Sequence, residues 1–235
     1  MKTIGMIGGM TWASTADYYR LLNEEVRKRL GKLNSAKILL YSFNFEEFKP
    51  PSDPAGWKKS GEILSGIAQK LEDAGADCIM ICSNTPHMVA DTVQQNISVP
   101  FIHIAEETAK EIARQNINTA GLLGTKFTME QSFFRDRLEK FGIETLIPEE
   151  AERNFIHYTI FNELGIGIFS HETKEKYLEI IEDLKNKGAE GIIFGCTEIP
   201  MLIKEEESPL PVFDTLRIHA KAAVDFALEK YIVNI

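Results

Sequence analysis

The stretch GADCIMICSNTP at residues 75–86 recurs in altered form as GAEGIIFGCTEI at residues 188–199. Aligned without gaps, the two stretches place Ser83 of the first at the position of Cys196 in the second. Each is a short apolar run that ends in polar residues, which is typical of a buried strand leaving its sheet. The repeat predicts two similar half-molecules, each of which supplies one proton-carrying side chain to a shared site.

Two further pairs of stretches repeat in the same order. TIGMIG at 3–8 matches TAGLLG at 119–124, and VPFI at 99–102 matches LPVF at 210–213. Matches in the same order and at nearly constant spacing indicate that the whole architecture is duplicated.

Apolar runs rich in β-branched residues alternate with amphipathic stretches along the chain. We expect strands over 2–8, 36–43, 76–83, 99–104, 118–123, 143–147, 190–195 and 211–213. We expect helices over 14–30, 57–74, 87–96, 105–115, 128–141, 149–163, 172–187, 198–205 and 216–230. Because several strand runs are apolar throughout, they should be covered on both faces, as in the parallel sheets of α/β proteins.

The predicted fold class is α/β, with two pseudo-symmetric domains that each contain a parallel sheet flanked by helices. The first domain is expected to combine residues 1–98 with 209–235, whose helix returns to it, and the second to cover 99–208. Ligands of such sheets bind beyond the C-terminal ends of the strands, so the active site is expected in the cleft between the domains. The Pro-rich stretch 49–54 is the candidate for a loop that gates this site.

The composition is ordinary for a globular protein, with 44% hydrophobic and 26% charged residues. No apolar run approaches the roughly 20 residues of a membrane span, and the N-terminus enters a strand pattern without the regions of a signal peptide. The three cysteines lack the spacing of a disulfide framework, which favours a reducing compartment and a cytoplasmic location. A net charge of −9 argues against a nucleic-acid partner, so a carboxylate ligand would need local donors such as backbone N–H groups.

Cys196 stands at the expected end of a strand, directly before Thr197 and Glu198, where a helix is expected to begin. The N-terminus of a helix stabilises a thiolate, so we expect the pKa of this cysteine to be lowered from about 8.5 toward neutrality. A thiolate so placed can act as a base or as a nucleophile. The alternative is an inert cysteine in the core, but the strand-end position, the polar neighbours and the duplication favour a catalytic role.

The first half offers two candidates for the equivalent role. The gap-free repeat places Ser83 there, and successive strand residues point to opposite faces, so Cys82 and Ser83 should not both reach one site. Cys82 would then be structural, although a bulge in the strand could make it the proton carrier instead. Cys78, which lies further back in the strand, is predicted to belong to the core.

Residues next to the strand ends are the candidates for substrate contacts. The helix starts offer free backbone N–H groups that could receive a carboxylate. The alternatives are helix capping by the Asn and Thr side chains, and a tight strand-to-helix turn after the first strand of each half. The substrate-binding candidates are Met10, Asn84, Thr85, Pro86, Thr125, Thr128, Thr197 and Glu198.

The sequence contains no recognisable cofactor or metal motif. The glycine spacing differs from the dinucleotide fingerprint G-x-G-x-x-G, and the phosphate-binding loop pattern does not occur. The histidines and cysteines lack the spacing of zinc ligands, so no metal is predicted. His87 could orient a partner residue, although packing or exposure is the simpler explanation, and His103 and His219 are predicted to be structural.

Four motifs together resemble the aspartate/glutamate racemase family: IGGMTW at 7–12, CSNTPH at 82–87, GTKFTM at 124–129 and GCTEI at 195–199. The likeness covers nearly the whole chain, and its last two-thirds are most similar to the enterobacterial L-aspartate/glutamate-specific branch. The resemblance implies a cofactor-independent enzyme that acts on a small-molecule amino acid and forms a homodimer. It also implies a two-domain fold in which a cysteine from each half flanks the substrate Cα.

The sequence departs from the family pattern at two places. The usual first motif has a cysteine directly before Asn-Thr, whereas this chain has Ser83, in keeping with the hydroxyl residue of the enterobacterial branch. The aspartate-specific archetype carries an Arg after the second strand and a Lys in the second half. The corresponding stretches 43–48 and 163–167 contain neither base, so an acidic substrate side chain lacks its usual partners.

These features lead to the hypothesis of an amino-acid racemase that needs no pyridoxal phosphate or other cofactor and acts on Asp, Glu or a related amino acid. Cys196 would remove the Cα proton as a thiolate, and Ser83 would return one on the opposite face. One alternative is a decarboxylase or cis-trans isomerase of small dicarboxylic acids that uses a single thiol. Another is a non-catalytic protein that binds a small molecule.

Overall fold

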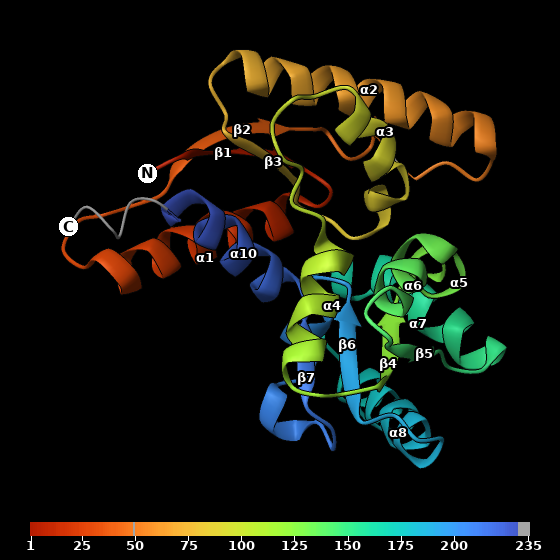
Figure 1. The fold of residues 1–235 in the computed structure, drawn as a ribbon. Helices are drawn as coiled ribbons and strands as arrows, with labels where there is room; N and C mark the ends of the chain where they lie inside the picture. The colour runs from red at the N-terminus through yellow and green to blue at the C-terminus, as the bar shows by residue number, and fades with distance from the viewer. Residues whose placement is uncertain (49, 230–235) are drawn as a thin grey trace. The chain divides into compact units, whose positions relative to one another are not determined.

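The structure is a computed structural model that describes residues 1–48 and 50–229. The chain divides into two compact units, Met1–His103 with His219–Ile235, and Ile104–Ile218. Each unit is a parallel sheet flanked by helices, which confirms the predicted α/β class (Figure 1). The second division lies after the last strand rather than before it, because that strand pairs with the sheet of the second unit.

The first unit contains a three-stranded parallel sheet in the order β2-β1-β3. Figure 1 shows α2 over one face of this sheet and α1 and α10 over the other. Ile4, Met6 and Ile7 of the central strand β1 are fully buried, which explains its continuous apolar run. The elements of this unit are β1 (Thr3–Gly8), α1 (Trp12–Leu30), β2 (Lys37–Ser42), α2 (Pro54–Asp73), β3 (Cys78–Ile81), the 3-10 helix η1 (Thr85–Val89), α3 (Ala90–Gln95) and most of α10 (Thr215–Leu228).

The second unit contains a four-stranded parallel sheet in the order β5-β4-β6-β7. Helices α7 and α8 pack on β4 and on each other, and α4 packs against α6. Phe194 of β6 and Phe213 of β7 are among its fully buried core residues. The elements are α4 (Ile104–Arg114), β4 (Thr119–Gly124), α5 (Lys126–Glu130), α6 (Ser132–Glu139), β5 (Glu144–Leu146), α7 (Glu150–Asn162), η2 (Leu164–Ile166), α8 (His171–Asn186), β6 (Gly191–Gly195), α9 (Ile199–Leu202), η3 (Glu205–Glu207) and β7 (Val212–Asp214).

The repeat found in the sequence is also a repeat of hydrogen bonds. In the first unit the backbone N–H of Ile79 donates to the carbonyl oxygen of Pro100 at 2.9 Å. In the second unit the N–H of Ile192 donates to the carbonyl oxygen of Pro211, also at 2.9 Å. Ile79 and Ile192 are partners in one pair of repeated stretches, and Pro100 and Pro211 are partners in another, so corresponding stretches of the two halves form the same edge of their sheets.

The strand expected over 99–104 is wrong in its extent. Within this stretch only Phe101 pairs with the sheet, as a single bridge to Ile79. Pro100 takes part through its carbonyl oxygen, and α4 already begins at Ile104, which ends the extended stretch. The apolar pattern therefore marks a short sheet edge rather than a full strand.

The helix expected over 87–96 divides into η1 and α3, and two further expected helices are interrupted by extended residues. The helix expected over 128–141 begins earlier and divides into α5 and α6, because Gln131 adopts an extended backbone with ψ of 154°. The helix expected over 198–205 reduces to α9 and η3, since Lys204 is also extended with ψ of 155°. Amphipathic periodicity continues across both breaks and does not reveal them.

The Pro-rich stretch predicted to gate the site includes residue 49, which lies outside the described residues. Residues 50–54 lead into α2, where Asp53 is the N-cap and its Oδ1 accepts from the backbone N–H of Gly56 at 2.9 Å. Gating by this loop stays a prediction. Among the helices of the described residues, none has the length and apolarity needed to cross a membrane.

Candidate active site

Cys196 follows β6 directly, at the C-terminal end of the second sheet. Gly124 and Gly195 end the neighbouring strands β4 and β6, and the side chain of Thr128 packs against both. A Cβ atom on Gly195 would lie 2.8 Å from the carbonyl oxygen of Leu123, closer than real Cβ atoms approach. Glycine therefore allows the two strand ends to come together beside Cys196.

The thiol of Cys196 is hydrogen-bonded to a carboxylate two residues further on. Its Sγ–H donates to Oε2 of Glu198 at 2.9 Å, and the hydroxyl of Thr197 donates to the same oxygen at 2.8 Å. Cys196 is 8% exposed, whereas Glu198 is half-buried. Glu198 was predicted to contact the substrate, and in the structure it contacts the predicted catalytic thiol.

The expected lowering of the Cys196 pKa is wrong. Burial raises the pKa of this thiol well above its ordinary value, and the negative charge of Glu198 and the hydrogen bond to it raise it further. The backbone N–H groups of Thr197 and Glu198 lower the pKa by less than these effects raise it. Helix α9 begins only at Ile199 and has four residues, so its N-terminus does not outweigh burial.

A buried tyrosine near this thiol has no signal in the sequence. The hydroxyl of Tyr177 on α8 is hydrogen-bonded to the hydroxyl of Thr159 at 3.0 Å. Burial is the main cause that raises the pKa of Tyr177 above its ordinary value, and the charges of Cys196, Glu163 and Glu198 add to the increase. Tyr177 therefore stays protonated as a hydrogen-bonded core residue.

Thr125 and Thr128 form the turn that follows β4. The side-chain oxygen of Thr125 accepts from the backbone N–H of Thr128 at 3.3 Å, which caps α5. Thr128 is fully buried, and Thr125 is 6% exposed. These contacts give both residues a structural role, and their contact with a substrate stays a prediction.

In the first unit, Ser83 follows β3 and is half-buried, at the position equivalent to Cys196. Cys82 is fully buried, and its backbone N–H donates to the carbonyl oxygen of Ile7 at 2.9 Å, which continues the pairing with β1. Burial raises the pKa of Cys82 far above its ordinary value, and it raises the pKa of Cys78 to about 12. The accessible side chain at this strand end is the serine.

The other candidates of the first unit are largely enclosed. Asn84, Thr85, Pro86 and Met10 are all buried, with 4% of Asn84 and 5% each of Thr85 and Met10 exposed. Asn84 holds the N-cap position of η1 without making a capping hydrogen bond through its side chain, so simple capping does not explain its presence. These four residues stay predicted substrate contacts.

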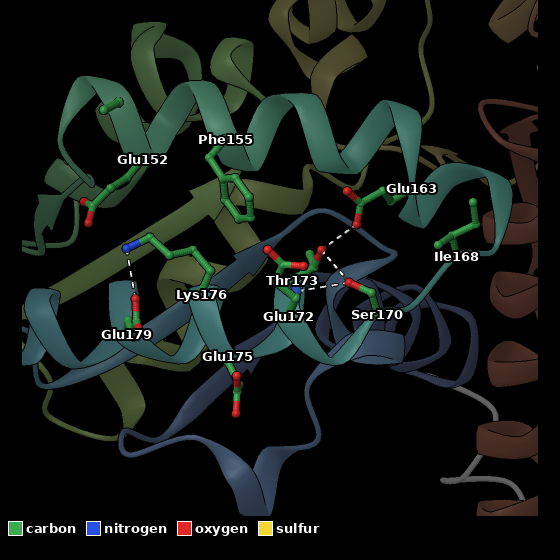
Figure 2. Close-up of a pocket in the computed structure, with 11 residues that line it drawn as sticks. Glu152, Phe155, Glu163, Ile168, Ser170, Glu172, Thr173, Glu175, Lys176 and Glu179 are labelled. Atoms are coloured by element: carbon green, nitrogen blue, oxygen red, sulfur yellow. Dashed lines mark hydrogen bonds and ion pairs between the residues drawn. The ribbon is translucent and has the colours of Figure 1, made fainter.

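A separate groove lies between α7 and α8, and Figure 2 shows the side chains along it. Glu163 accepts from the hydroxyl of Thr173 at 2.5 Å, and Ser170 donates to Thr173 at 2.8 Å. None of the predicted catalytic or substrate-binding residues lines this groove, so it is not the site outlined above. Its lining consists of Ala151, Glu152, Phe155, Glu163, Ile168, Ser170, Glu172, Thr173, Glu175, Lys176 and Glu179.

Comparison with known proteins identifies the family to which this chain belongs. The model of the Asp/Glu/hydantoin racemase family matches residues 7–223. The chain belongs to this family. It is therefore an amino-acid racemase or epimerase that works without pyridoxal phosphate.

Individual relatives agree with this assignment over nearly their full lengths. The broad-specificity amino-acid racemase RacX of Bacillus subtilis (strain 168) is 28% identical over 229 residues, which are 94% of this chain and 96% of RacX. A Yersinia pestis structure assigned provisionally to the Asp/Glu racemases has a TM-score of 0.91 and 46% identity, over 97% of this chain and all of that one. An aspartate racemase homologue from Pyrococcus horikoshii OT3 has a TM-score of 0.85 and 38% identity, over 97% and 99% of the two chains.

Proposed function

We propose that this racemase inverts the Cα configuration of a free amino acid, with Cys196 and Ser83 as its two proton carriers. The observation that carries the proposal is the 2.9 Å hydrogen bond from Cys196 to Glu198 at the C-terminal end of the second sheet. This pair joins a thiol, which becomes a base when it loses its proton, to a carboxylate that can accept that proton. The likeness to RacX and to the P. horikoshii homologue supports an amino-acid substrate.

The raised pKa of Cys196 sets the order of the proton transfers. The resting thiol is protonated, and transfer of its proton to Glu198 gives a thiolate that the backbone N–H groups of Thr197 and Glu198 stabilise. A thiolate whose thiol has a high pKa is a strong base, which suits the removal of a weakly acidic Cα proton. The Cα proton then moves to Sγ, and the negative charge spreads onto the carboxylate of the substrate.

On the other face of Cα, the Ser83 hydroxyl would donate its proton to the carbanion, and water would return a proton to the resulting alkoxide. The hydroxide so formed would take up the proton that Glu198 received from Cys196, which restores the resting state. A hydroxyl ionises less readily than a thiol, so Ser83 should donate a proton better than it abstracts one. Backbone N–H groups at the strand ends, together with Asn84, Thr85 and Thr197, would stabilise the charge on the substrate carboxylate. The proposal requires both strand ends to reach one substrate.

The substrate is proposed to be Asp, Glu or a related amino acid. A screen of L- and D-amino acids in deuterated water without added cofactor tests this by nuclear magnetic resonance. Racemisation exchanges the Cα proton for deuterium and keeps the carbon skeleton, whereas a decarboxylase shortens the skeleton and a binding protein does neither. We expect exchange and loss of optical activity for at least one amino acid.

Two cysteine variants complete this test. Cys196→Ala should abolish exchange and inversion, whereas Cys78→Ala removes a buried thiol of the core and should keep both. Inversion that survives Cys196→Ala would overturn the proposal. Loss of inversion in Cys82→Ala but not in Ser83→Ala would instead transfer the role in the first half to Cys82.

A homodimer in the cytoplasm is also part of the proposal. The resemblance to the racemase family implies the dimer, and the three free cysteines fit a reducing compartment. Light scattering of the purified chain at several concentrations tests the dimer, and a monomer at all of them would contradict it.

A further inference from the structure

His87 makes two hydrogen bonds to the backbone that follows β3. Its backbone N–H donates to the carbonyl oxygen of Asn84 at 3.0 Å, and its Nδ1 lies 2.8 Å from the carbonyl oxygen of Ser83. Because a carbonyl oxygen can only accept, Nδ1 carries the proton in this contact. His87 therefore fixes the two successive peptide groups on the C-terminal side of Ser83.

The peptide group on the other side of Ser83 is held as well. The hydroxyl of Ser14 donates to the carbonyl oxygen of Cys82 at 3.1 Å. Because peptide groups are planar, fixing the groups on both sides of a residue fixes its φ and ψ. The direction of the Cα–Cβ bond of Ser83, and with it the reach of the hydroxyl, thus depends on Ser14 and His87.

The ring of His87 is held in place by other rings. The centroids of His103, Phe101 and His219 lie 4.8, 5.4 and 5.5 Å from that of His87. His219 is itself fixed, because its Nε2–H donates to the carbonyl oxygen of Ile102 at 2.7 Å. Only 2% of His87 is exposed, so the imidazole cannot turn away from Ser83 without moving the core.

The other nitrogen of His87 indicates why a histidine occupies this place. Nε2 is buried and has no hydrogen-bond partner within residues 1–48 and 50–229. A buried acceptor without a donor destabilises a fold, and an apolar side chain would avoid that cost. The described residues also hold no group of three or more His, Cys, Asp or Glu side chains that could bind a metal. The contact that an apolar side chain could not make is the Nδ1–H bond to Ser83.

In the second half, the proton-carrying residue is held in position by different contacts. The repeat aligns His87 with Pro200, which has no side-chain donor, and the carbonyl oxygen of Cys196 accepts from the backbone N–H of Ile199 at 3.3 Å. There the proton-carrying side chain itself is held, by Glu198. In the first half, His87 and Ser14 instead hold the backbone on either side of Ser83.

We propose that His87 is a positioning residue of the racemase, and that its Nδ1–H bond to the Ser83 carbonyl holds the serine hydroxyl where it can protonate Cα. This inference rests on the proposed function and adds a residue that does not touch the substrate. Burial and the neighbouring histidines hold the pKa of His87 well below its ordinary value, so the ring keeps its single Nδ1 proton at neutral pH.

The test compares His87→Asn with His87→Gln. The side-chain nitrogen of Asn can take the place of Nδ1, whereas that of Gln extends toward the place of Nε2. In a variant whose Ser83 hydroxyl is misplaced, Cys196 can still exchange the Cα proton that faces it for deuterium. Inversion also needs Ser83, so it should slow more than exchange does. We expect the ratio of deuterium exchange to inversion to rise about tenfold in His87→Gln and to stay within about threefold of the parent in His87→Asn.

A control variant separates positioning from general packing. His219→Gln perturbs the same ring cluster but leaves the Nδ1–H donor of His87 in place, so it should lower the melting temperature and change the ratio much less than His87→Gln does. Equal ratios in the Asn and Gln variants overturn the inference and leave the proposed function intact. No inversion of any amino acid by the parent chain overturns the proposed function and this inference with it.

A measurement on the parent chain covers the case in which a variant does not fold. Nitrogen-15 spectra of labelled histidine distinguish the two neutral tautomers of each ring. The expected result for His87 is a protonated Nδ1 that persists at neutral pH. A protonated Nε2 would exclude the bond to Ser83 and overturn the inference.

Discussion

Cys196 and Ser83 occupy equivalent places in the repeat, yet their surroundings differ. The thiol is 8% exposed and donates to the carboxylate of Glu198, whereas Ser83 is half-buried and is held through its backbone by His87. A buried thiol needs a nearby proton acceptor because burial disfavours its charged form. The carboxylate supplies that acceptor within the same turn of chain.

The variant Glu198→Gln tests this at the level of one residue. Glutamine keeps the shape but cannot take the proton of Cys196, so we expect the turnover number to fall about 100-fold. The negative charge of Glu198 also raises the pKa of Cys196, so that pKa should fall in the variant. It should nevertheless stay above its ordinary value, because burial is the larger cause. Steady-state kinetics and thiolate absorbance measure the two effects, and undiminished turnover would remove Glu198 from the mechanism.

The sequence identifies Cys196 but not its state. The amino-acid sequence shows that Cys196 follows an apolar run and precedes polar residues. It also shows that Ser83 stands where the family pattern has a cysteine. The pKa of the thiol depends on how deeply the chain buries it and on the rotamer of Glu198, and neither follows from local sequence. The same holds for Tyr177, whose position in an amphipathic helix resembles that of any core residue.

At the scale of elements, the site depends on the close approach of the C-terminal ends of β4 and β6. The first two contacts of a Cβ atom on Gly195 would be 2.8 Å to the Leu123 carbonyl oxygen and 3.0 Å to a methyl group of Leu122. Backbone atoms inside a sheet cannot move aside without breaking ladder hydrogen bonds. A side chain at this position would therefore separate the strand ends that carry Cys196.

Two glycine-to-alanine substitutions give opposite expectations. Gly195→Ala should lower the free energy of unfolding by about 2 kcal/mol because it overpacks the strand end. Gly66→Ala lies in α2, where an added Cβ meets no atom within 4 Å, and should raise the free energy of unfolding by about 1 kcal/mol. Urea unfolding of both variants provides the measurement, and a Gly195→Ala variant as stable as the parent would contradict the close approach.

Most elements follow from hydrophobic periodicity, because buried parallel strands and amphipathic helices have distinct patterns. Periodicity fails where local backbone geometry decides. The strand expected over 99–104 is reduced to one bridge because α4 begins at Ile104, and Gln131 divides an expected helix although its neighbours keep the helical pattern. These breaks depend on tertiary packing on both sides of the residue, which a window of sequence does not contain.

For the whole molecule, the duplication extends to side chains outside the site. Asp77 accepts from the backbone N–H of Thr3 at 2.6 Å, and Glu190 accepts from that of Thr119 at 3.1 Å. The acids stand at aligned positions before β3 and β6, and the threonines begin β1 and β4. Repeated capping of the sheets in this way supports one ancestral half whose two copies later diverged at Ser83 and Cys196.

The histidine cluster of the first unit makes the stability of the molecule dependent on pH. Burial lowers the pKa of His219 to about 4, and burial and the neighbouring histidines lower that of His87. Because the unfolded chain binds these protons near pH 6.5 and the folded chain does not, the free energy of unfolding should fall between about pH 6.5 and 4. His219 alone contributes up to about 3 kcal/mol to this loss.

Urea unfolding at several pH values measures this dependence. His219→Gln removes the contribution of His219 to the linkage, so its free energy of unfolding should depend less on pH between about 6.5 and 4 than that of the parent. An equal slope for parent and variant would show that His219 titrates normally in the folded chain.

The most direct measurement of the central claim follows deuterium at Cα separately from each enantiomer in Ser83→Ala and Cys196→Ala. If Cys196 is the base on one face, Ser83→Ala still exchanges the enantiomer whose proton faces the thiol but no longer inverts it. Cys196→Ala should then neither exchange that enantiomer nor invert either one. Continued inversion without the thiol, or loss of all exchange in Ser83→Ala, would contradict a pair of proton carriers led by Cys196.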